Sequence, residues 1–87
     1  MKAVVTVIGK DKVGILARVA STCAESNVNV IEVTQSILQE FFAMVMIVDV
    51  TEMNCELDTL TENLNKNVND MTIHVMHEDI FNSMHRI

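Results

Sequence analysis

The chain has 87 residues, of which 49% are hydrophobic, and its 12 acidic residues outnumber its 6 Lys and Arg residues to give a net charge of −6. This length allows one domain with a thin core, so association of subunits is a natural way to bury more apolar surface. The acidic balance excludes the basic footprint of a nucleic-acid binder and disfavours anionic membranes. No apolar run approaches the ~20 residues that span a bilayer, and the first run is too short for a secretion signal. We therefore expect a cytoplasmic protein, with Cys23 and Cys55 as reduced thiols.

The first half of the chain predicts a strand, a helix and a second strand. Residues 3–8 are mostly β-branched and lead into a loop rich in glycine and charge, which is typical of a strand that ends there. Asp11 is the expected N-cap of the helix, and Asn27 suits the left-handed residue that ends it. The apolar residues between them recur at helical spacing: Ile15, Leu16, Val19, Ala20 and Cys23.

Residues 28–38 return to alternation, which predicts a half-buried edge strand. One predicted face carries Ile31 and Val33, and the other carries Val30 and Glu32. A hairpin tip at residues 39–40 leads to a third strand over 41–50, which has almost no polar residue.

The last third of the chain predicts a helix, a strand and a terminal helix. Asn54 is the expected cap of a helix whose apolar stripe is Leu57, Leu60, Leu64 and Val68. Residues 71–77 alternate as a strand, and residues 78–87 have the helical spacing of a short docked helix.

This order of elements predicts an α+β fold of the ferredoxin-like βαββαβ type. Right-handed crossovers give an antiparallel sheet of order 4-1-3-2 with two helices on one face and a short C-terminal helix. We expect one domain over residues 1–77, with 78–87 as a helical extension packed on it.

Strand 41–50 is apolar on both faces, although the predicted helices cover only one face of the sheet. An exposed apolar face would be a liability in a monomer. We therefore expect a homodimer. Coverage by the C-terminal helix is an alternative that can coexist with it.

The loop from Gly9 to Gly14 is the best candidate for a ligand site. Glycines let backbone approach a ligand, and the N–H groups at a helix N-terminus favour a carboxylate. Lys10 and Lys12 add positive charge, and Asp11 could hold an ammonium group. These groups match the two ends of a free amino acid. Taken alone, however, the loop favours a tight turn with a helix cap over a ligand site, and it lacks the Lys-Ser/Thr of a phosphate loop.

Residues 5–17 and 27–32 together resemble the ACT domain, which has a strand, a Gly-Asp-x-x-Gly-Ile/Leu-Leu turn into a helix, and a second strand opening with Asn-Ile or Asn-Val. The whole chain looks like small stand-alone ACT proteins of bacteria and archaea, an uncharacterised family related to the ACT domains of the glycine cleavage system transcriptional repressor. The resemblance implies that an amino acid binds at a subunit interface. It implicates, together with the charge of Lys12, the residues Asp11, Val13, Gly14, Ile15, Asn29 and Val30. Val13 stands where many members have proline, which makes this loop less rigid.

Other chemistry finds little support in the sequence. His74 and His77 point to opposite faces of a strand, and a soft metal site formed by His74 with Met44, Met46 and Met76 is the weaker alternative to plain packing. The first loop lacks the cysteines of a copper chaperone and the arginine of an acylphosphatase. We therefore expect no enzyme, no cofactor and no metal.

Two functions remain open. In the first, a small-molecule-sensing regulatory domain binds an amino acid and signals to a partner protein. In the second, the domain is a protein–protein interaction module with no small ligand.

Overall fold

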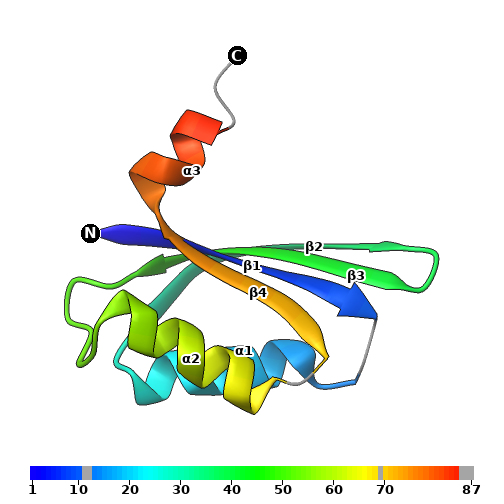
Figure 1. Ribbon diagram of the computed structural model, residues 1–87, viewed down its shortest axis with the longest axis horizontal. Helices are drawn as coiled ribbons and strands as arrows, with labels where there is room; N and C mark the ends of the chain where they lie inside the picture. Colours follow the sequence, from blue (N-terminus) through cyan, green and yellow to red (C-terminus); the bar gives the residue numbers. More distant parts are fainter. Residues whose placement is uncertain (11–12, 69, 85–87) are drawn as a thin grey trace.

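Four antiparallel strands form one sheet in the order β2-β3-β1-β4 in the computed structural model, which describes residues 1–10, 13–68 and 70–84. The elements in chain order are β1 (Lys2–Lys10), α1 (Ile15–Glu25), β2 (Asn29–Leu38), β3 (Phe41–Asp49), α2 (Leu57–Asn67), β4 (Met71–His77) and α3 (Glu78–Met84). Helices α1 and α2 cover one face of the sheet, and α3 lies on the other side (Figure 1). The predicted βαββαβ order and sheet order are confirmed.

The core lies between the sheet and helices α1 and α2. Alternate residues of the two central strands face these helices, as in the pairs Val5–Met46 and Val7–Met44. The helices contribute fully buried side chains to the same core, namely Val19, Cys23, Leu60 and Leu64. The apolar stripes predicted for the helices are therefore directed into the core, except for Leu16 of α1, which is 37% exposed. Burial among these side chains raises the pKa of the Cys23 thiol to about 11.

The two predicted N-caps are wrong. The N-cap of α1 is Gly14, in the left-handed conformation with φ 84°, and Asp11 lies outside the described residues. Helix α2 begins at Leu57 with Glu56 as its N-cap. Asn54 instead donates its side-chain N–H to the Glu25 carbonyl oxygen at 3.1 Å, so it fastens the connection before α2 to the end of α1. Asn27 has φ 58°, which confirms the left-handed residue predicted after α1.

A β-bulge corrects the predicted faces of β2. The register of β2 on β3 shifts between Val30 and Glu32, so Val30 pairs with Val48 of the core face and Glu32 pairs with Ile47 of the other face. Val30 therefore packs against the core and does not share a face with Glu32. Strict alternation fails here because a bulge inserts one extra residue into the strand.

Helix α3 begins directly after β4 and packs against β1 and β4. It is the observed part of the predicted terminal helix, whose residues 85–87 lie outside the described residues. In the part of the chain that the structure describes, no helix is long and apolar enough to cross a membrane.

Candidate functional site

The predicted ligand loop leads from the end of β1 into the first turn of α1. Gly14 is left-handed, Val13 beside it is fully exposed, and Ile15 is buried as the first residue of the helix. The first helical hydrogen bond runs from the Arg18 N–H to the Gly14 carbonyl oxygen at 3.0 Å. Because the N-cap residue is Gly14, it supplies no side-chain hydrogen bond to the first turn of α1. The N–H groups of this first turn are the kind that binds an anion. Asp11 and Lys12 lie outside the described residues.

Asn29 and Val30 lie at the opposite end of the sheet from this loop. Asn29 pairs with Asp49, and Asp49 pairs with Lys2 at the start of β1. The loop follows Lys10 at the other end of β1. Between the two ends β1 extends about 27 Å, at ~3.4 Å per residue. Within one chain, the structure does not bring the two predicted halves of the site together (Figure 1).

Asn29 lines a shallow pocket of about 470 Å³. The polar residues around it are Asn27, Asn29, Asp49, Thr51 and Glu52, joined by Ala24 and Val28. Sequence reasoning missed this group, although Asp49 ends the long apolar run of the third strand. The pocket forms because the end of α1, the start of β2 and the segment after β3 meet at one end of the sheet. The Asn27 amide fastens this meeting point by donating to the Glu52 carbonyl oxygen at 2.8 Å.

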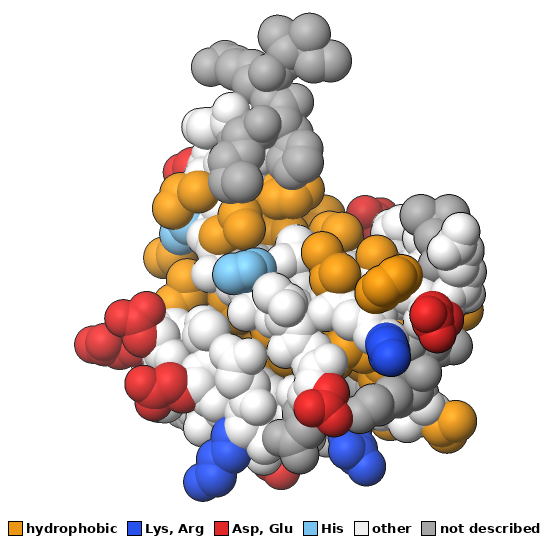
Figure 2. All heavy atoms as spheres, turned by 45° about the vertical axis from the view of Figure 1, so that its right-hand side comes forward, with side chains coloured by type: hydrophobic (Ala, Val, Ile, Leu, Met, Phe, Trp, Pro, Cys, Tyr) orange, Lys and Arg blue, Asp and Glu red, His pale blue; other side chains and the backbone are white. Residues whose placement is uncertain are grey.

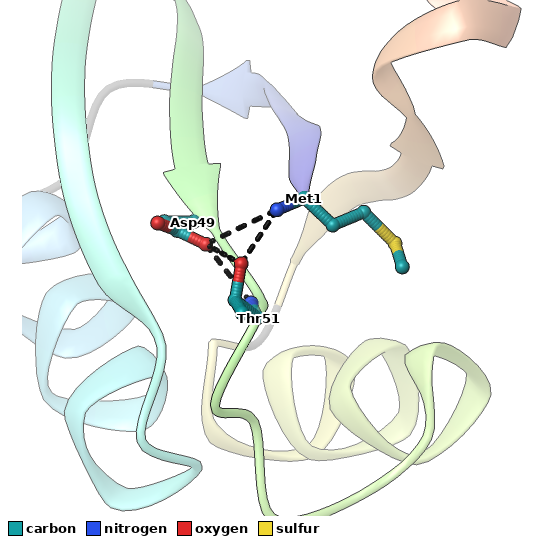
Figure 3. A network of polar contacts seen from close by, with 3 residues as sticks. All are labelled: Met1, Asp49 and Thr51. Carbon is teal, nitrogen blue, oxygen red and sulfur yellow. Dashed lines mark hydrogen bonds and ion pairs between the residues drawn. The ribbon is translucent and has the colours of Figure 1, made fainter.

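The carboxylate of Asp49 accepts two hydrogen bonds from Thr51 (Figure 3). The hydroxyl group donates at 2.6 Å and the backbone N–H at 2.9 Å. These bonds hold the pKa of Asp49 below its usual value, with a smaller contribution from the Met1 amino group 3.7 Å away. Because Asp49 is anionic at neutral pH, this end of the sheet suits the ammonium or amide part of a ligand better than a carboxylate.

No group of three or more His, Cys, Asp or Glu side chains that could hold a metal ion occurs among residues 1–10, 13–68 and 70–84. The alternative soft metal site does not assemble, because Met44 and Met46 are buried in the core while His74 and Met76 pair with Thr6 and Val4 on the opposite face. His77 lies 3.7 Å from Asp79, through its Nδ1 atom, in an exposed pair.

Comparison with known proteins gives the family. The sequence profile of the ACT domain matches residues 2–78. A UPF0237 protein of Clostridium perfringens is 44% identical over the full length of both chains, and one of Methanopyrus kandleri is 42% identical over 99% of this chain and 98% of the relative.

Solved structures show the same fold. An ACT domain protein from Streptococcus pneumoniae superimposes with a TM-score of 0.77 at 31% identity, covering 93% of each chain. A glycine cleavage system transcriptional repressor superimposes with a TM-score of 0.67 at 20% identity, covering 85% of this chain and 43% of the repressor. The chain belongs to the ACT domain family.

Proposed function

We propose that this domain is a cytoplasmic regulatory sensor that binds a free amino acid between two copies of the chain and signals to a partner protein. The observation that carries the proposal is the separation of Gly14 and Asn29 to opposite ends of one sheet. A ligand a few ångströms across cannot touch both ends of one chain. A site that uses both the loop and Asn29 therefore requires two chains.

The edge strand β2 offers a route to such a pairing. It lies at one side of the sheet and leaves Ile31 and Ile37 exposed. If β2 of one copy lies antiparallel to β2 of the other, the start of each strand meets the end of its partner. Each Asn29 then comes to the loop end of the other copy, next to Val13 and Gly14. Pairing two edge strands would also remove a row of unsatisfied backbone groups.

The chemistry of the two halves fits the two ends of an amino acid. The N–H groups at the start of α1 suit the carboxylate, and the helix dipole reinforces them. The carboxylate of Asp11 suits the ammonium group. The amide of Asn29 supplies a polar contact to the rest of the ligand, and Val30, whose side chain packs against the core, holds Asn29 at the start of β2. Gly14 leaves the helix start open: apart from its chain neighbours, no atom of the described residues lies within 4 Å of the position where its Cβ would be.

The occurrence of this fold as one part of larger proteins supports a regulatory role. A formyltetrahydrofolate deformylase and a putative glycine cleavage system transcriptional repressor each contain the fold as a minor part of their length, 29% and 43% of the chain. In both, a domain of this shape is joined to a further segment of the same chain. By analogy, we propose that this chain acts on a separate protein.

Thermal unfolding in the presence of each free amino acid tests the ligand. A ligand that binds only the folded protein at 100 times its Kd stabilises it by about 2.7 kcal/mol and raises Tm by several degrees. We expect Asn29→Ala to abolish that rise, whereas Asn65→Ala, on the exposed side of α2, keeps it. If no amino acid raises Tm, the domain is an interaction module without a small ligand.

Mixing two inactive variants tests the shared site. A heterodimer of Gly14→Val and Asn29→Ala subunits has two ligand sites. One site combines the two altered halves, and the other combines two intact halves. With random pairing, half of the dimers are heterodimers with one intact site of two, so we expect an equimolar mixture to regain about a quarter of the wild-type binding stoichiometry by calorimetry. A mixture as inactive as its components would show that the site lies within one chain.

A further inference from the structure

The sheet face turned away from α1 and α2, called the open face below, is apolar along its two central strands. Its residues follow from the strand register: Thr6 and Ile8 of β1 lie beside Ala43, Val45 and Ile47 of β3. Figure 2 shows hydrophobic side chains gathered with histidine on the upper part of the molecule, while the acidic and basic side chains lie mainly at its lower part and margins. Ile8 and Phe41 are large apolar side chains that this face leaves about half exposed, and exposed apolar side chains gathered on one face indicate a contact.

Helix α3 covers only one end of the open face. Val4 and Ile8 lie on the same side of the same strand, yet Val4 is 2% exposed and Ile8 is 51% exposed. Val4 lies at the end where α3 packs on β1 and β4. At the loop end, Phe41 is 52% exposed. The open face is therefore closed by α3 at one end and accessible at the loop end.

We propose that a second copy of this chain packs on the open face, with its strands running in the opposite direction, so that α3 of each copy lies at the loop end of the other. Under this two-fold symmetry, each contact occurs twice. The exposed Ile80 of one α3, at 55% exposure, then meets the exposed Ile8 and Phe41 of its partner, and the reverse holds as well.

The dimensions of the parts are consistent with this arrangement. Two sheets packed face to face lie ~10 Å apart, and a helix with its side chains is ~10–12 Å across. A helix that rises from one end of a sheet thus fills the space beside a second sheet without holding the two sheets apart.

Charge selects the antiparallel orientation over the parallel one. Helix α3 carries Glu78 and Asp79 in its first turn, and the loop end of the open face carries Lys10. Antiparallel packing brings these acids of one copy toward Lys10 of the other. Parallel packing would bring them over β2 and β3 of the other copy, where Glu32 lies on the same face, while Asp49 there is already paired with the Met1 amino group. Since like charges repel, the parallel arrangement is disfavoured.

This contact is independent of the ligand site proposed above. The two-fold axis of an edge pairing through β2 stands perpendicular to the sheet, whereas the axis of the face pairing lies parallel to the sheet. If the two axes intersect, they close into a four-chain assembly. Failure of the edge pairing would leave a face-paired dimer, so the two proposals can fail separately.

Sedimentation equilibrium of the full chain over a range of concentrations tests the face contact. We expect Phe41→Glu to raise the dissociation constant of one association step at least about tenfold, because it places a charge in an apolar contact. Asn65→Glu adds the same charge to the exposed side of α2 and should leave association unchanged. Circular dichroism establishes that both variants are folded. Wild-type protein that stays monomeric, or identical masses for wild type and Phe41→Glu, would overturn the proposal.

Charge reversal tests the orientation by a route that leaves the apolar face intact. Lys10→Glu and Asp79→Lys should each weaken association, and the double variant should restore it. Within one chain these two residues lie at opposite ends of the sheet, so a restored affinity must come from contacts between chains. A double variant as weak as the sum of its single changes would overturn the antiparallel arrangement.

Discussion

Gly9 of β1 lies directly opposite Met71 of β4, with no room between them for a Cβ atom. A Cβ at Gly9 would collide with the Met71 sulfur and lie 3.0 Å from the Asp70 carbonyl oxygen. The side chain can move aside, but the backbone oxygen cannot do so cheaply. This contact sets how closely the end of β1 approaches β4. It thereby also positions the loop that follows β1.

Gly9→Ala should lower the free energy of unfolding by about 1–2 kcal/mol, the usual effect of overpacking. Urea denaturation measures it. In a Met71→Ala background the same substitution should cost less, because only the contact with the Asp70 oxygen remains. An equal cost in both backgrounds would mean that the Met71 sulfur plays no part.

Substitution of Gly14 should also lower the free energy of unfolding, but for a different reason. Its φ of 84° is disfavoured for residues with a side chain, yet a Cβ there would meet nothing within 4 Å. We expect Gly14→Ala to cost about 1–2 kcal/mol through backbone strain alone. Gly14→Asn should cost less, because asparagine tolerates this conformation better. Urea denaturation of the two variants compares these costs, and equal losses would contradict the backbone explanation.

Leu64 of α2 is fully buried and should be among the most sensitive core positions. Leu64→Ala should destabilise the fold by about 2–5 kcal/mol, because it removes buried methyl groups and leaves a cavity. Leu16→Ala is the matched control, since Leu16 is 37% exposed on α1. Comparable losses in the two variants, measured by chemical denaturation, would contradict the burial of Leu64.

Asp49 should titrate below its usual range, and Thr51 should be the cause. Because folding lowers the pKa of Asp49, its contribution to stability is present at neutral pH and is lost as the pH falls through the lowered value. Thr51→Val removes the hydroxyl hydrogen bond and should raise the pKa of Asp49 part of the way back, since the backbone N–H bond remains. Thr51→Ser should keep the low value. NMR titration of the Asp49 carboxyl group in the wild type, Thr51→Val and Thr51→Ser measures this pKa. An unchanged pKa in Thr51→Val would rule out the Thr51 hydroxyl hydrogen bond as its cause.

Cys23 and Cys55 should differ in reactivity. Cys23 is buried with its pKa raised to about 11, while Cys55 is only partly buried. At pH 8, iodoacetamide should label Cys55 first and leave Cys23 unmodified until the protein unfolds, as mass spectrometry can show. Since the folded thiol titrates at about 11 in place of 9.0, its contribution to stability should be lost as the pH rises through that range. Equal labelling rates of the two thiols in the folded protein would contradict the burial of Cys23.

The local spacing of apolar residues was sufficient to predict the helices and strands, but it was insufficient to predict the residues at which they begin. The apolar spacing in α1 and α2 predicted the buried stripes, because a helix repeats every 3.6 residues whatever surrounds it. The caps at Asp11 and Asn54 were wrong, because the path of the incoming chain decides which residue precedes a helix. Val30 was placed on the wrong face because a bulge depends on the neighbouring strand, which the alternation within β2 does not record.

By itself, the sequence determined the order of elements, the side of each helix that is buried and the two-sided apolar character of β3. Each of these depends on residues close together in the chain. Only the tertiary structure decided that Asn29 lies with Asp49 and Thr51, about 27 Å along the sheet from the loop with which the sequence had grouped it. It also decided that α3 covers Val4 and leaves Ile8 exposed. The physical reason is the same for both: strand direction and register join residues far apart in the sequence, and they separate Asn29 from Gly14 although the two are only fifteen positions apart in the chain.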